Sequence, residues 1–449
     1  MHYAGIDIGS VSVNTVIIDE TGRIISRDYR PHHGKITDAL KESLESHAIQ
    51  TVSLSVRTAN TPDILAANLR KEGIDARVLE ESPELIHQSM QINNGQCLPV
   101  SIIAQEAIEY VRRHDLRPAD TVLWIARAQV ACNIPMYPYF IKNLFQRCGE
   151  GMEELGVYVG ELSHLEINPR VSVQAYFAYM CGGLLRRLGC QTRPYELKPG
   201  QTDRCIQTSF EELRSAFQGD APLDEAVAGM IDRFRSIPKD TSTQRPKAAI
   251  FGDLYVRDND IMNQDLVRSI EAAGGEVITT PYNEYARIVS SAYFRKWFKE
   301  GQYLMWLKNR SLLKAIELVE KRFYSHFREY FTEASFPGSR ESEELLGTFN
   351  IHVQQGGESM ENILKIFHIL REHPDTALFV QAVPSYCCPA MITEAMNRDI
   401  ERVTGVPVVS ITYDGTGATQ NDKIIPYLLY RSGSEETVLQ REHTAAFPE

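Results

Sequence analysis

The sequence has no long hydrophobic run and comparatively few basic residues. No stretch of its 449 residues approaches the ~20 consecutive apolar residues that a membrane helix needs. The first residues, MHYAGIDIGS, lack the basic segment and apolar core of a secretory signal, so we expect a cytoplasmic protein with no membrane partner. Lys and Arg number 47 against 59 Asp and Glu, a net charge of −12. This balance argues against a nucleic-acid partner, which favours a basic surface.

Cysteine is also scarce, at eight residues, and no pair has the Cys-x-x-Cys spacing. So few cysteines do not make the disulfide scaffold of a small secreted domain. In a reducing cytosol they are core thiols, metal ligands or nucleophiles, and the residues around each one must decide between these roles. Cys148 and Cys190 lie at expected helix ends and Cys181 lies inside a helix, so we interpret these three as core or surface thiols.

Short apolar runs alternate with helical patterns along most of the chain, which predicts an α/β fold. This order favours parallel sheets with helices on both faces. We expect two Rossmann-like parallel-sheet domains with a helical insertion, after a small β-rich N-terminal fragment. The expected boundaries are 1–60 for that fragment, 61–240 for the first α/β domain, 247–432 for the second with its insertion at about 285–345, and 433–449 for a flexible tail.

One expected helix contains a glycine pair. Residues 173–190 have helical spacing, but Gly182 and Gly183 lie in the middle of the segment. Because glycine is a poor helix former, we expect the helix to be interrupted there.

The remaining cysteines are placed differently, apart from Cys205, which lies in a polar stretch. Cys97 lies on a turn just before an expected helix, and Cys132 lies just past the end of an expected strand. Cys387 and Cys388 follow another strand and precede a helix. Ligands of open α/β sheets bind at the carboxyl ends of strands. A helix N-terminus also favours the thiolate, the form that binds metal. These positions therefore indicate a metal site.

Several longer motifs resemble a known group of proteins. From about residue 91 to residue 430 the chain is similar to the 2-hydroxyacyl-CoA dehydratase and benzoyl-CoA reductase superfamily. Within it, the chain looks most like the C-terminal part of large CoA-enzyme activase-like proteins and like double-cubane cluster proteins. The motifs are GQCLPV, ACNIPMYP, FAYMCGGLLRRLGC, GDLYVRDNDIMNQDL, EVITTPYNEY, YCCPAM and ITYDGTGATQND.

The resemblance implies an iron–sulfur cluster held by cysteines from separate α/β domains. Its ligands here would be Cys97, Cys132 and Cys387, with Cys388 as the fourth. The cluster would be a 4Fe–4S cubane or a double cubane, and two cubanes would need about six thiolates. It would pass single low-potential electrons to an acyl-CoA or another small-molecule substrate.

The N-terminal segment GIDIGSVSVNTVIID resembles the first phosphate loop of that superfamily's ATP-dependent activators, which have an actin/hexokinase-like fold. Asp7 would then hold Mg²⁺ through water, while Gly9 and Ser10 let the turn approach a phosphate of ATP. A second phosphate loop and an adenosine loop are missing between residues 52 and 91. The fragment is therefore interpreted as a truncated ATPase. It either binds ATP or serves only in packing or docking.

Three functions remain open at this point. The first is an iron–sulfur electron-transfer or reductase protein, and the second is an ATP-dependent activase that donates electrons to a CoA-thioester enzyme. The third is a scaffold that binds no metal. The expected partner is a second copy of the chain, or a separate ATPase or reductase subunit.

Some polar and aromatic residues allow two interpretations. Asp258, Asn259 and Asp260 lie between an expected strand and helix, where they would line a cleft or cap the helix. The glycine turn at 355–359 precedes a helix and is a candidate anion site. Tyr137, like Tyr139, Tyr176 and Tyr179, is interpreted as a core or interface aromatic.

Overall fold

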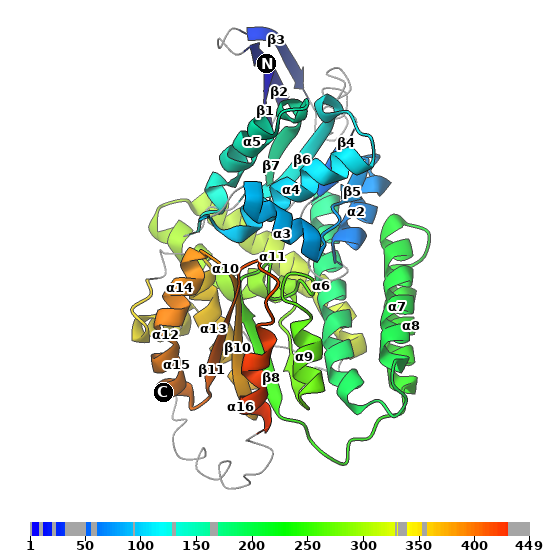
Figure 1. Ribbon diagram of the computed structural model, residues 1–449, viewed down its shortest axis with the longest axis vertical. Helices are drawn as coiled ribbons and strands as arrows, with labels where there is room; N and C mark the ends of the chain where they lie inside the picture. Colours follow the sequence, from blue (N-terminus) through cyan, green and yellow to red (C-terminus); the bar gives the residue numbers. More distant parts are fainter. Residues whose placement is uncertain are drawn as a thin grey trace.

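The computed structural model describes residues 2–8, 12–19, 24–31, 51–54, 61–92, 95–127, 132–161, 169–327, 330, 339–352 and 357–429. The chain forms two lobes, each built around a parallel four-stranded sheet, and a small antiparallel sheet lies at one end (Figure 1). The expectation of a mixed α/β fold with parallel sheets is therefore confirmed. Within the described ranges, none of the helices combines the length and the apolar character that crossing a membrane requires.

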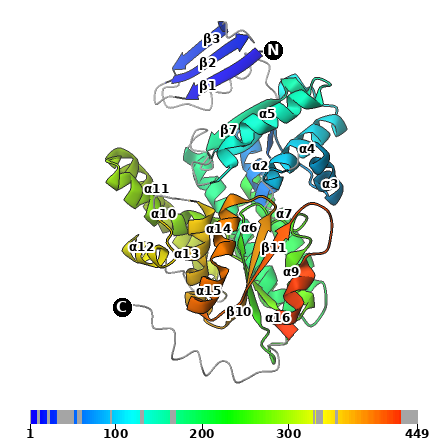
Figure 2. The same ribbon diagram turned by 60° about the vertical axis from the view of Figure 1, so that its left-hand side comes forward.

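The antiparallel sheet contains β1 (His2–Ile8), β2 (Ser12–Asp19) and β3 (Ile24–Pro31) in that order. Figure 2 shows it beyond α5 (Tyr137–Cys148) and β7 (Gly156–Glu161), at the end of the molecule that carries the N-terminus. Alternating apolar residues and the turn-forming sequence between β2 and β3 are typical of such strands.

The first parallel sheet has the order β5-β4-β6-β7, made of β5 (Ala76–Val78), β4 (Thr51–Leu54), β6 (Thr121–Arg127) and β7 (Gly156–Glu161). β4 lies within the range expected for the N-terminal fragment, but it pairs with β5 and β6. The first lobe thus begins before residue 60. Its helices are α2 (Thr61–Lys71), α3 (Pro83–Ile92), α4 (Leu98–Arg113) and α5 (Tyr137–Cys148).

The second parallel sheet has the order β11-β10-β8-β9. Its strands are β8 (Lys247–Gly252), β9 (Glu276–Ile278), β10 (Thr376–Pro384) and β11 (Val408–Tyr413). The two parallel sheets have the same strand order. In each, the second strand in sequence pairs with one edge of the first strand, and the third strand pairs with its other edge and is followed by the fourth. β8 and β10 are almost wholly buried, which is why their sequences are continuous apolar runs rather than alternating patterns.

Helix α6 (Pro169–Thr192) connects the two lobes. Val171 and Tyr179 pack with Trp124 of the first sheet, whereas Cys190 lies in the apolar cluster around the second sheet. The helix is continuous through the glycine pair, so the expected interruption is wrong. The reason is packing, because a Cβ on Gly183 would lie 2.7 Å from the Cβ of Pro281. The glycine allows a close approach between α6 and the start of α10 (Tyr282–Lys299).

The other helices complete the two lobes. α7 (Gln201–Gln218) and α8 (Leu223–Ser236) form an antiparallel pair beside α6. The expected helical insertion corresponds to α10 (Tyr282–Lys299), α11 (Tyr303–Tyr324) and α12 (Ser339–Thr348). The second sheet is covered by α9 (Leu266–Ala272), α13 (Glu358–Glu372), α14 (Cys388–Ala395), α15 (Asn397–Thr404) and α16 (Ile425–Leu429).

Candidate metal centre

The carboxyl ends of β8 and β10 meet at the centre of the second sheet. β9 lies on the far side of β8 and β11 on the far side of β10, so the chain connections diverge between the two central strands. Such a switch point is where open α/β sheets bind ligands. Asp253 directly follows β8, and Cys387 lies just beyond the end of β10.

A glycine allows Asp253 to reach this position. Gly252 has a φ of 118°, and a Cβ there would lie 2.4 Å from the carbonyl oxygen of Ala382 in β10. The backbones of the two strands are therefore in direct contact, and the N–H of Asp253 donates to the same oxygen at 3.0 Å. A larger residue at position 252 would separate the strand ends.

Cys387 and Cys97 come from different lobes and meet in the same cluster. Cys387 precedes α14 and Cys97 precedes α4, as the sequence predicted, and both are nearly fully buried. Tyr386 has a φ of 62°, which is unusual for a bulky residue, and its side chain is 60% exposed while Cys387 turns inward. The N–H of Leu98 donates to the carbonyl oxygen of Ser385 at 3.2 Å, which ties the two helix starts together.

Cys97 and Cys387 belong to the same buried cluster, and the interaction with Cys97, followed by burial, raises the pKa of Cys387 strongly. The hydroxyl of Tyr137 donates to Cys97 Sγ at 3.2 Å. Tyr137 is buried, and burial followed by the neighbouring Cys97 raises the pKa of its hydroxyl well above 10. The sequence interpretation of Tyr137 as a core aromatic was incomplete, because the residue also holds one of the site thiols.

Two carboxyl groups complete the buried cluster. Ligand atoms of Asp253, Glu358 and Cys387 all lie within 4.8 Å of one another, and all three residues are buried. Asp253 Oδ1 accepts the N–H groups of Tyr255 and Val256, both at 2.9 Å. Glu358, the first residue of α13, accepts the N–H of Leu254 at 3.1 Å.

Burial raises the pKa of both carboxyls, and the proximity of Asp253 raises that of Glu358 further. Two carboxylates and a thiolate in so small a buried space would repel one another unless they bind protons or a cation. Carboxylate oxygen and thiolate sulfur are both metal ligands, and metal binding would displace the protons. The Asp253, Glu358 and Cys387 group therefore has the composition and spacing to bind a metal ion.

Cys132 lies close to this group, whereas Cys388 makes a different contact. Burial raises the pKa of the Cys132 thiol to about 12, and the charges of Glu358, Cys97 and Asp253 add to the shift. The Cys388 thiol is half-buried and lies 3.6 Å from Oδ1 of Asn133, to which it donates. The structure thus brings together Cys97, Cys132 and Cys387 with two unpredicted carboxyls.

A sequence signal existed for both carboxyl groups. Asp253 directly follows the apolar run KAAIFG, and Cys132 and Cys387 likewise lie just after expected strands. Glu358 lies within the glycine turn at 355–359 that was expected to bind an anion. Residues 355 and 356 lie outside the described ranges, but a carboxyl group beside Asp253 makes an anion an unfavourable ligand there.

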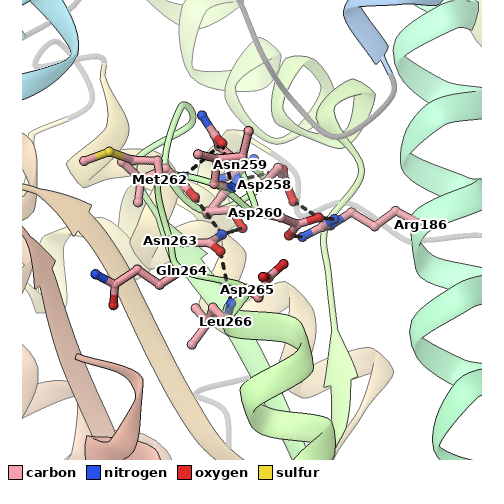
Figure 3. Close-up of polar contacts among 12 residues, drawn as sticks. Arg186, Asp258, Asn259, Asp260, Met262, Asn263, Gln264, Asp265 and Leu266 are labelled. Carbon is pink, nitrogen blue, oxygen red and sulfur yellow. Dashed lines mark hydrogen bonds and ion pairs between the residues drawn. The ribbon is translucent and has the colours of Figure 1, made fainter. Parts of the chain in front are cut away.

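The loop between β8 and α9 is held by its own polar residues (Figure 3). Asn259 Oδ1 accepts the N–H groups of Ile261 and Met262, both at 3.1 Å. Asp260 forms a two-point ion pair with Arg186 of α6 at 2.8 and 2.5 Å. Asp258 lies 3.6 Å from the same guanidinium.

Asn263, rather than any of the three expected residues, accepts the first N–H of α9, that of Leu266, at 3.0 Å. The expected capping of this helix by Asp258, Asn259 or Asp260 is therefore not what the structure has. Polar loop residues satisfy one another first, and only the register of the folded loop decides which one reaches the helix.

Other predicted residues lie outside the cluster or outside the described ranges. Asp7 is in β1, opposite Asn14 of β2. Gly9 and Ser10, the rest of the expected nucleotide loop, lie outside the described residues. Cys181 and Cys205 are buried in the apolar cluster around α6 to α8, and Cys148 lies beside Arg112 at 3.5 Å.

No protein-family model and no curated protein matches this sequence.

Proposed function

We propose that this chain is an iron–sulfur protein that transfers single low-potential electrons, or uses them for a reduction, at the junction of its two parallel-sheet lobes. The observation that supports this most directly is that Cys97 and Cys387, which come from separate lobes, are buried in one cluster. Cys132 is the third proposed ligand, since its thiol is electrostatically coupled to the same group. Cys388 remains a candidate fourth ligand, which would have to leave Asn133 to bind.

The chain's own residues would prepare such a site in three ways. The starts of α4 and α14 place the Cys97 and Cys387 thiols side by side in the buried site. Tyr137 would donate its hydrogen bond to the Cys97 sulfur, and bonds of this kind tune the potential of a bound cluster. Asp253 and Glu358 would hold protons beside the thiols. When bound, an iron–sulfur cluster supplies one electron at a time.

The remaining expectations are part of this proposal. The two parallel-sheet lobes would be Rossmann-like, and the N-terminal sheet would be a truncated actin/hexokinase-like fragment. The chain would act in the cytoplasm on an acyl-CoA or another small molecule, as a homodimer or with an ATPase or reductase subunit. Binding of ATP by the purified protein would favour the activase function instead.

One observation favours a second candidate, a mononuclear metal centre. Asp253, Glu358 and Cys387 lie within 4.8 Å of one another, and a mixed oxygen and sulfur set suits a single iron or zinc ion. In that case Asp253→Asn would remove the metal, whereas Cys97→Ala would leave it. Acid-labile sulfide separates the candidates, because only a cluster contains it.

The direct test is metal analysis after anaerobic purification. We expect iron and acid-labile sulfide in the wild-type protein, and a large loss of both in Cys387→Ala. The matched control is Cys148→Ala, because Cys148 lies away from the site at the end of α5. Equal iron in the two variants would contradict the ligand assignment, and a colourless, iron-free wild-type protein would contradict the proposed function.

A further inference from the structure

Helix α13 starts at the candidate metal centre and is buried along most of its length. Every residue from Glu358 to Ile369 is buried. Apart from the exposed Arg371, its ionisable residues are spaced three or four positions apart. At about 100° per residue they fall within an arc of about 80°, so they form a single ionisable face. Its members are Glu358, Glu361, Lys365, His368 and Glu372.

Fixed ion pairs occupy the half of this face nearest the site. Glu361 Oε1 forms ion pairs with Lys365 and with Arg257, which lies 3.2 Å away on the loop after β8. Arg257 also lies 3.5 Å from Asp258. Burial raises the pKa of Glu361 to about 7, and Arg257 opposes this shift. Glu361 can therefore gain and lose a proton near neutral pH.

The other half of the face reaches two further helices. His368 Nε2 lies 3.7 Å from Glu372 and 3.9 Å from Glu284 of α10. Arg187 of α6 lies 3.4 Å from each of these two carboxyl groups. His373, just after α13, is 3.3 Å from Arg187. Burial raises the pKa of Glu284 to about 8, so this group also titrates near neutral pH.

Two tyrosines of α10 lie near the start of the ionisable face. Tyr282 and Tyr285 are half-buried close to Glu358 and Glu361, and desolvation raises the pKa of both hydroxyls. They are neutral at physiological pH and add no charge to this part of the protein. The ionisable groups nearest the middle of α13 are Glu361, Lys365 and His368, and Glu284 lies 3.9 Å from His368.

The ionisable face of α13 ends near solvent. α13 has 15 residues, so it spans about 22 Å, from the carboxyl edge of the second sheet to the amino edge where β10 begins. Glu372 and His373 are half-buried there, and the neighbouring Asp375 is exposed and pairs with Lys247 at 2.8 Å. A row of ionisable groups thus runs from the surface to Glu361, which lies one helical turn from Glu358.

Stability does not explain this arrangement. Burying charges costs free energy, and apolar residues in place of a buried ion-pair network are often neutral or stabilising. Apart from Ser359 and Asn362, the other buried residues of α13 are apolar and include Ile363, Leu364 and Phe367. Apolar residues could therefore also have occupied the ionisable face. Ionisable side chains at intervals of about one helical turn are what a path for proton transfer needs.

We propose that the ionisable face of α13, from Glu372 through His368 and Lys365 to Glu361, conducts protons between solvent and the buried Asp253, Glu358 and Cys387 group. This inference rests on the proposed function. With the proposed cluster bound, one proton would enter along α13 for each electron that the cluster takes from an external one-electron donor, and Asp253 or Glu358 would hold that proton. The donor is oxidised by one electron, and the net charge of the buried site does not change.

The test uses the metal-free, full-length protein. Transfer into heavy water replaces each thiol S–H by S–D, and infrared spectroscopy follows the S–H band of each cysteine. The bands of Cys387 and Cys181 are assigned by their loss in Cys387→Ser and Cys181→Ser. In Glu361→Gln and in His368→Gln we expect exchange at Cys387 to slow by at least about tenfold, a barrier increase of about 1.4 kcal/mol.

Cys181 provides the internal control, because it is fully buried in an apolar cluster away from the ionisable face of α13. Its exchange should stay unchanged in both variants. Glu344→Gln, on the exposed side of α12, is the matched control and should leave both thiols unaffected. Unchanged exchange at Cys387 in both α13 variants, or equal slowing at Cys181, would overturn the proposal. Because no metal is present, this result is independent of the iron and sulfide analysis that decides the proposed function.

Discussion

Glu284 makes the stability of this protein depend on pH in a direction opposite to that of most carboxyl groups. It is buried between α6, α10 and α13, and burial raises its pKa from 4.5 to about 8 despite Arg187 at 3.4 Å. Between these two pH values the folded protein binds one proton more than the unfolded chain. The free energy of unfolding therefore falls by about 1.4 kcal/mol for each pH unit.

Replacing Glu284 by glutamine removes this dependence. The contribution of the neutral carboxyl is complete below pH 4.5 and is lost as the pH rises through about 8. A glutamine side chain is neutral throughout this range and of similar size. We expect the variant to match the wild type near pH 5, and to gain roughly 4 kcal/mol relative to it by pH 8, from three pH units at about 1.4 kcal/mol each.

The measurement is urea unfolding of both proteins by circular dichroism at several pH values between 5 and 8. The control is Glu344→Gln, whose exposed carboxyl pairs with Arg340 on the surface of α12 at 2.9 Å, an interaction of little weight. Parallel wild-type and Glu284→Gln profiles would refute the reasoning. They would mean that Glu284 is already ionised in the folded protein and paired with Arg187.

Two further variants test packing and the site. Gly183→Ala should destabilise the protein by about 1–2 kcal/mol, because the added Cβ would lie 2.8 Å from the backbone Cα of Pro281. The control is Gly347→Ala, which should not destabilise the protein because the space around its Cβ is open. Equal unfolding midpoints for the two variants would contradict the close packing of α6. Tyr137→Phe should cost the metal-free protein about 1 kcal/mol by removing the hydrogen bond to Cys97. If iron is bound, the same change should lower the reduction potential without changing the iron content, and an unchanged potential would show that the hydroxyl does not reach the ligand.

Local patterns were sufficient for most of the α/β framework. The apolar run that became β10 predicted a strand buried on both faces, and all nine of its residues are buried. The glycine pair in α6 shows the limit of such patterns. Glycine lowers helix propensity, but contact with Pro281 requires a residue without a side chain, and this contact exists only in the folded protein.

The sequence by itself placed Cys97 and Cys387 at the starts of two helices, because the surrounding turn residues and apolar runs are local signals. It did not show that the two residues lie in one buried cluster, since they belong to separate lobes. The spacing that brings Glu361 and His368 to one face of α13 is present in the sequence too, but such a polar face most often points to solvent. Only the tertiary structure decided that α6, α10 and the β8–α9 loop cover this face, and burial is what brings the carboxyl groups there into the neutral pH range.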